Sequence, residues 1–92
     1  MKHAGAAALD RLEPLLEELR GVATLREKSR GVFYVKSKAF LHFHEDPTGL
    51  YADVRAADGA RFDRLKVDHP AGRAALLKQV RATRGLDALR GS

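Results

Sequence analysis

The sequence predicts an α+β fold, a two-layer sandwich in which an N-terminal helix, an antiparallel sheet of three or four strands and a C-terminal helix follow in order. Leucines at helical spacing near the start of the chain indicate an amphipathic helix. The middle of the chain is rich in β-branched and aromatic residues between turn signals, which is typical of consecutive strands. A second helical pattern follows, and placing both helices on one sheet face buries both apolar stripes.

The first helix is expected over residues 7–20. Its apolar stripe is made of leucines three and four residues apart: Leu9, Leu12, Leu16 and Leu19. Gly21 is placed to end the helix. Pro14 lies within the pattern and lacks the N–H of one helical hydrogen bond, so we expect a kink there.

The strands are expected between clear turn signals, over residues 22–28, 32–44, 50–55 and 61–67. The second of these carries the strongest β pattern, without Pro or internal Gly. It is long for one strand, so we expect a bend or bulge near Ser37–Lys38. Tight turns are predicted at Asp46-Pro47-Thr48-Gly49 and at Asp58-Gly59.

The second helix is predicted to begin with Asp68 as its cap and Pro70 in its first turn. Its inner face is formed by Leu76, Leu77 and Val80, and Gly85 is expected to end it. With 92 residues the chain is expected to form a single domain over 1–92, with a core of about 7–84 and a loose tail at 86–92.

Composition narrows the classes of function. Cysteine is absent, which excludes disulfides, thiolate zinc sites and a cysteine nucleophile, and is expected of a cytoplasmic protein. No apolar run approaches the roughly 18 residues of a membrane span, so no membrane association is expected. The net charge is +5, with positive charge concentrated in residues 26–40 and 61–92, which favours nucleic acid as a partner.

Strand alternation divides the central hairpin into two faces. Pairing through the turn at 46–49 places His44 opposite Tyr51, His42 opposite Asp53 and Phe40 opposite Arg55. One face is then apolar and takes the helices. The other is predicted to present polar and aromatic side chains to solvent or a partner, the lysines included if no bulge intervenes: Lys36, Lys38, Phe40, His42, His44, Tyr51, Asp53 and Arg55.

Aromatic side chains interleaved with cations on a sheet face can stack bases and neutralise phosphates. The sequence therefore predicts a non-enzymatic binding module with nucleic acid as its expected ligand. Its predicted contacts are the outer-face residues and cations of the second helix: Lys36, Lys38, Phe40, Tyr51, Arg55, Arg73, Lys78 and Arg81. The alternative is that the two aromatics only cover the sheet, with a cation–π contact from Arg55.

A second hypothesis is a metal- or small-ligand-binding protein centred on His42, His44 and Asp53. Alternation places the two imidazoles on one face about 7 Å apart, and Asp53 is expected across from them, as a 2-His-1-carboxylate site requires. Neighbours along one strand point in parallel rather than converge, so a solvated polar face is the alternative to a metal site.

Catalysis is not expected, and no cofactor is predicted. The serines lack a nucleophile-elbow context and the chain has no glycine-rich phosphate loop. A third hypothesis is a structural homodimer that buries the Phe40 and Tyr51 face between two copies and leaves no ligand surface there.

Two segments, 31–43 and 46–55, resemble the MmcQ/YjbR-like proteins, with matching positions at Lys38, Phe40, Gly49 and Arg55. In element order the resemblance covers residues 7–82. It implies the compact α+β fold called CyaY-like and a role in DNA binding. The chain departs from the family because it has no tryptophan, and its C-terminal portion is shorter.

Overall fold

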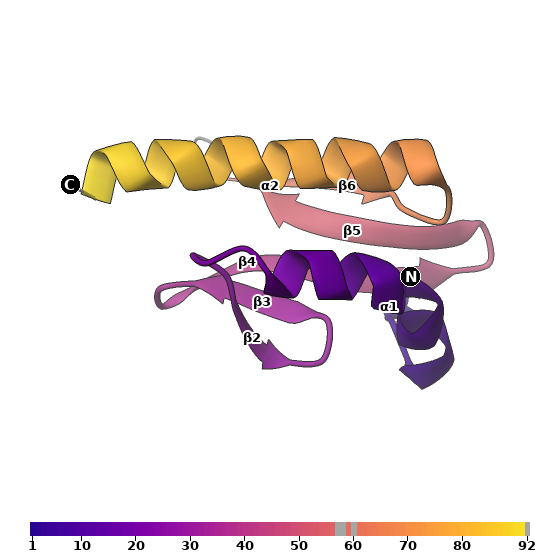
Figure 1. The fold of residues 1–92 in the computed structure, drawn as a ribbon. Coiled ribbons are helices and arrows are strands. Elements are labelled where there is room, and N and C mark those ends of the chain that lie inside the picture. Colours follow the sequence, from indigo (N-terminus) through magenta and orange to yellow (C-terminus); the bar gives the residue numbers. More distant parts are fainter. Residues whose placement is uncertain (57–58, 60, 92) are drawn as a thin grey trace.

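The computed structural model describes residues 1–56, 59 and 61–91, and it confirms the predicted α+β class (Figure 1). The elements in chain order are β1 (Lys2–His3), α1 (Ala6–Arg20), β2 (Arg26–Ser29), β3 (Val32–Val35), β4 (Lys38–Asp46), β5 (Gly49–Arg55), β6 (Phe62–Lys66) and α2 (Pro70–Gly91). The described strands form one antiparallel sheet of six, rather than three or four.

The main path of the sheet runs β2-β3-β4-β5-β6, and β1 pairs with β4 off this path. On one edge of β4, β3 pairs with its first half, up to Leu41. The second half of that edge is taken by β1, where His3 faces His44. The short strand at the start of the chain thus completes the edge that β3 leaves open.

The predicted strand over 32–44 is two strands, and this is the main correction to the expected topology. The chain reverses direction through Lys36 and Ser37, so that Val35 pairs with Lys38. Lys36 has a φ of 57°, in the left-handed region that a two-residue hairpin turn requires. Neither Gly nor Pro marks this turn, which is why the sequence pattern predicted a bend instead of a hairpin.

A bulge in β4 changes the position of Phe40. Phe33 faces Leu41, but the next pair is Tyr34 with Ala39, so β4 has one extra residue at this point. Phe40 is 3% exposed and belongs to the hydrophobic core. The prediction that Phe40 lies on the outer face is therefore wrong, because strict alternation does not continue through a bulge.

Both helices cover the same face of the sheet. The core joins the leucine stripe of α1 to Leu76, Leu77 and Val80 of α2 over the inner side chains of the strands. The buried strand residues include Phe33, Leu41, Phe43, Leu50, Ala52 and Val54. Within the described residues no helix covers the other sheet face, and the polar side chains of β4 and β5 lie there.

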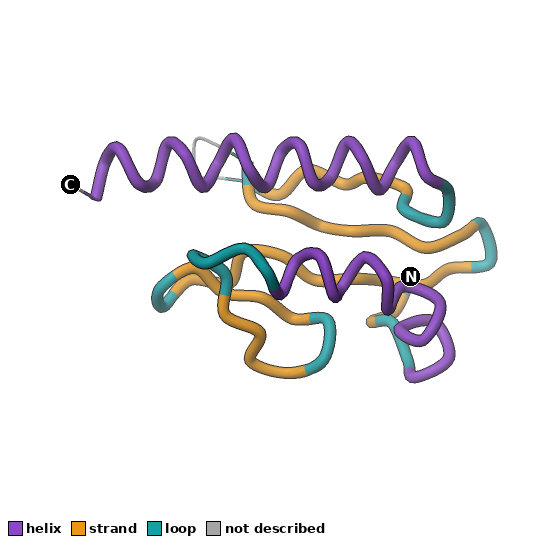
Figure 2. Tube along the Cα trace, in the orientation of Figure 1, coloured by secondary structure: helices purple, strands orange, loops and turns teal. Residues whose placement is uncertain are grey.

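The ends of α2 differ from the prediction. The cap is His69 rather than Asp68: Pro70 is the first helical residue, and the N–H of Gly72 donates to His69 Nδ1 at 3.2 Å. Gly72 also allows close packing, since an added Cβ would lie 1.7 Å from the carbonyl oxygen of Lys66. The helix continues through Gly85 to Gly91, and its last turns extend past the strands (Figure 2).

The loose tail predicted for 86–92 and the single-domain boundaries stay predictions. No helix in the described ranges combines the length and apolarity needed to cross a bilayer.

Candidate metal centre on the open sheet face

Three histidines meet on the sheet face opposite the helices, and we call them the histidine cluster: His3, His42 and His44. His3 comes from β1, and the other two come from β4. Strand pairing sets their positions, because His3 faces His44 across the β1–β4 ladder. Two predicted pairs, His42 with Asp53 and His44 with Tyr51, are confirmed by the β4–β5 register.

The imidazoles of the histidine cluster are in mutual contact. One ring nitrogen from each residue lies within 4.8 Å of the corresponding nitrogens of the other two. The ring centroids of His42 and His44 are 4.9 Å apart in an edge-on arrangement, and His3 stacks on His44 at the same separation. The expectation that His42 and His44 point away in parallel is wrong, because rotation about the side-chain bonds brings their rings together.

Sequence reasoning missed His3. A two-residue strand is too short to show alternation, so Lys2–His3 carried no strand signal. The available signal was composition: the chain has four histidines, and three of them meet in this cluster. The fourth, His69, caps α2.

Asp53 lies beside the histidine cluster. It is 7% exposed and is the only charged residue that is buried within the described part of the chain. Arg64 on β6 holds the carboxylate with two hydrogen bonds, from Nε to Oδ1 at 2.7 Å and from Nη2 to Oδ2 at 2.8 Å. The nearest imidazole atom, His44 Nε2, is 3.1 Å from Oδ2.

These contacts determine the charge states at the site. The hydrogen bonds from Arg64 are the main cause of a lowered pKa of Asp53, so the carboxylate is ionised near neutral pH. Burial, followed by the proximity of His44, lowers the pKa of His42, so its neutral form is favoured. Neutral imidazole and ionised carboxylate are the forms that bind metal ions.

Within the described ranges, the ring nitrogens of the histidine cluster are not all hydrogen-bonded. His42 Nδ1 and His44 Nε2 are 2.9 Å apart, so one nitrogen must donate and the other accept. His44 Nδ1 is buried and has no hydrogen-bond partner among the described residues. In the part of the chain that the structure describes, one buried nitrogen of the cluster is therefore left without a hydrogen bond.

The spacing of these nitrogens fits a metal site after small side-chain movements. Zn–N bonds of about 2.0–2.1 Å place the ligand atoms of a tetrahedral site roughly 3.4 Å apart. In the histidine cluster the separations extend from 2.9 Å, between His42 and His44, to at most 4.8 Å. Rotations that move single atoms by about an ångström would therefore bring three nitrogens to bonding distance of one ion.

The residues predicted to bind nucleic acid are not brought together in the same way. Phe40 is in the core. Arg55 donates to the carbonyls of Ala39 and Gly59 at 2.8 and 2.9 Å, and its guanidinium also stacks on Phe62.

The remaining predicted contacts lie on separate elements. Arg73 donates to the carbonyl of Val67, and the hydroxyl of Tyr51 is hydrogen-bonded to that of Thr48. Four cations are exposed, two at the β3–β4 hairpin and two on α2: Lys36, Lys38, Lys78 and Arg81. Of the two aromatics predicted to stack bases, Phe40 is thus not available on the outer face.

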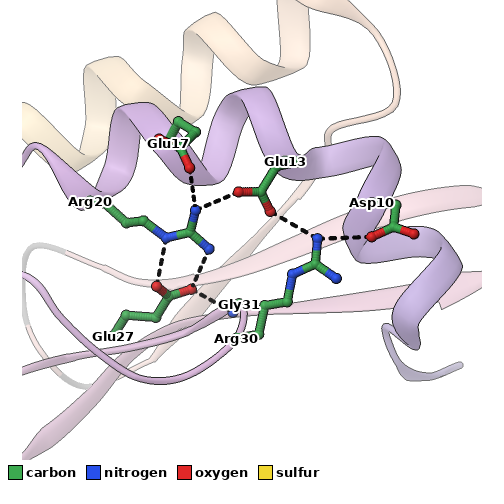
Figure 3. Close-up of polar contacts among 7 residues, drawn as sticks. All are labelled: Asp10, Glu13, Glu17, Arg20, Glu27, Arg30 and Gly31. Carbon is green, nitrogen blue, oxygen red and sulfur yellow. Dashed lines mark hydrogen bonds and ion pairs between the residues drawn. The ribbon is translucent and has the colours of Figure 1, made fainter.

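A second polar cluster joins α1 to the β2–β3 hairpin, and we call it the arginine cluster: Asp10, Glu13, Glu17, Arg20, Glu27 and Arg30 (Figure 3). Arg20 pairs with three carboxylates at 2.5–2.7 Å. Arg30 bridges Asp10 and Glu13 at 2.9 and 2.8 Å. Each charge has a partner of opposite sign, so this cluster has the properties of a structural contact.

Comparison with known proteins gives no relative: no family model, no curated protein and no solved structure matches the chain. The resemblance to the MmcQ/YjbR-like proteins stays a prediction from the sequence.

Proposed function

We propose that this chain is a metal-binding domain whose histidine cluster takes one divalent transition-metal ion, with Zn²⁺ as the ion that suits it best. The observation that carries the proposal is the meeting of three ring nitrogens within 4.8 Å on one sheet face. Nitrogen ligands favour zinc, copper and nickel over magnesium and calcium. The role proposed is binding rather than catalysis.

Two features of the site support the proposal. The three ligands come from paired strands, which hold their backbones at fixed spacing and so reduce the entropy lost on binding. An ion would also replace the hydrogen bond between His42 and His44 with bonds to both nitrogens.

Calorimetric titration of chelator-treated protein with Zn²⁺ tests the proposal. We expect one ion per chain, and we expect His42→Ala to weaken binding by about 100-fold or more, since loss of an outer-sphere partner alone costs 10- to 100-fold. His69→Asn is the matched control: it removes the fourth histidine but keeps a capping acceptor on α2. Absence of binding, or equal affinity for wild type and His42→Ala, would refute the proposal.

Nucleic-acid binding and homodimer formation stay predictions from the sequence. The four exposed cations at two separate places support nucleic acid less than the convergent histidines support a metal ion. Titration with DNA and RNA at two salt concentrations tests it, because a phosphate-binding protein loses affinity steeply as salt rises. Light scattering at several protein concentrations tests the dimer.

A further inference from the structure

We infer that Asp53 is the fourth ligand of the metal centre and that Arg64 competes with the metal ion for its carboxylate, so that Arg64 sets the affinity of the site. The inference rests on the proposed function and adds to it the identity of the remaining ligand and the residue that tunes it. It follows from the position of one buried carboxylate and from the charge that faces it.

The position of Asp53 is that of a ligand. Its backbone is paired directly with that of His42 across the β4–β5 ladder. Its Oδ2 is 3.1 Å from His44 Nε2, close to the separation of roughly 3.4 Å between two ligand atoms of a tetrahedral zinc ion. An ion bound to His44 Nε2 therefore has this oxygen within reach.

Burial of Asp53 also needs an explanation. A carboxylate at 7% exposure is costly unless it is paired. Its partner Arg64 has a side chain that is 51% exposed and lies on β6, at the edge of the sheet's main path. An exposed arginine does not require a buried partner, so the burial of Asp53 reflects its place beside the histidine cluster rather than the needs of Arg64.

The ion and Arg64 would compete for one oxygen of the carboxylate, Oδ2. Arg64 Nε donates to Oδ1, while Nη2 donates to Oδ2. A metal ion would bind Oδ2 and displace the contacts from Nη2 and from His44, whereas the bond from Nε to Oδ1 could remain. The competition therefore concerns Oδ2, which binds Nη2 in the absence of the ion.

Whether removal of Arg64 raises or lowers the metal affinity distinguishes competition for Asp53 from simple orientation of Asp53. If Arg64 only oriented Asp53, its removal would lower metal affinity, as loss of an outer-sphere partner does. If it competes, removal frees the carboxylate for the ion and also takes a positive charge from beside a dication. Arg64→Gln would then raise the affinity.

The test uses the full chain, treated with chelator and titrated with Zn²⁺ alone. We expect Asp53→Asn to weaken binding by about tenfold or more and Arg64→Gln to strengthen it several-fold. Asp63→Asn is the matched control, because Asp63 on β6 accepts a hydrogen bond from Gln79 of α2 at 3.0 Å and so faces the helices. Its affinity should equal that of wild type.

A measurement on unmodified protein covers the case in which Asp53→Asn does not fold. Addition of Zn²⁺ should shift the carboxyl ¹³C resonance of Asp53 strongly and leave that of Asp63 in place. An unmoved Asp53 resonance, or an Arg64→Gln protein that binds Zn²⁺ no better than wild type, would overturn the inference. Either result with intact wild-type binding and a defective His42→Ala variant leaves the proposed function standing, whereas absence of wild-type binding removes both.

Discussion

The arginine cluster and the histidine cluster both join segments that are distant in sequence, but they are built from different kinds of interaction. Each connects a segment to a part of the fold that is distant in sequence: Arg20 ties the β2–β3 hairpin to α1, and His3 brings β1 to β4. The arginine cluster is built from opposite charges, and the histidine cluster is built from three imidazole rings. In the arginine cluster the opposite charges pair with one another. The ring nitrogens of the histidine cluster can donate electron pairs and need a cation to accept them.

The two clusters differ in whether their buried polar atoms have hydrogen-bond partners. In the arginine cluster Glu27 accepts from Arg20 and also from the N–H of Gly31 at 2.9 Å. In the histidine cluster His44 Nδ1 is buried and unpaired within the described ranges. A buried polar atom without a partner destabilises the fold, and among the described residues the histidine cluster has one while the arginine cluster has none.

The largest expected effect is stabilisation by metal. With Zn²⁺ at about 100 times its dissociation constant, the free energy of unfolding should rise by about 2.7 kcal/mol, and a chelator should remove the gain. The ion should also slow amide exchange at Ala4 and Gly5, whose N–H groups bond to the Phe43 carbonyl and to Glu45 Oε2. If Zn²⁺ raised the free energy of unfolding of His42→Ala by the same amount, the histidine cluster would not be the site where the ion binds.

The next effect is expected from the arginine cluster. Arg20→Met keeps the aliphatic stem but leaves Glu13, Glu17 and Glu27 without their shared cation. We expect the melting temperature to fall by several degrees while the affinity for Zn²⁺ stays unchanged. Arg26→Met, at an exposed position on β2, is the control. A fall of the same size in both variants would show that Arg20 has no special role in holding the hairpin.

The sequence was sufficient for the fold class because periodicity and turn chemistry are local. The leucine stripe of α1, the Asp-Pro-Thr-Gly turn and the pairing of His42 with Asp53 were all predicted and are present in the structure. A continuous β pattern over 32–44 concealed a hairpin, because the reversal at Lys36 uses a residue that is not typical of left-handed turns.

The candidate site was only half predictable for a related reason. The alternation of side chains along a strand placed His42, His44 and Asp53 on one face. A strand of two residues is too short to show such alternation. His3 joins the site only because β1 folds back on the free edge of β4, a long-range pairing that leaves no local pattern. Phe40 was assigned to this face by the same alternation, but one extra residue in β4 places it in the core instead.

The smallest expected effect concerns acid stability and belongs to the arginine cluster alone. Hydrogen bonds from Arg20 and then Arg30 lower the pKa of Glu13 to about 2, from an ordinary value of 4.5. Because the folded-state pKa is lower, Glu13 contributes stability that is fully present above pH 4.5 and is lost as the pH falls from there toward 2. Solvent screens this partly exposed side chain, so the contribution is modest.

The urea midpoint, measured between pH 5 and pH 2, should therefore fall less steeply for Glu13→Gln than for wild type, since the amide cannot take up the proton. Arg20→Met should flatten the curve in the same direction, because it removes the main cause of the lowered pKa of Glu13. Neither variant changes a residue of the histidine cluster, so any contribution from that cluster is common to the three proteins and cancels in the comparison. Parallel curves for wild type and both variants would mean that the cluster seen in Figure 3 does not hold its charges together in solution.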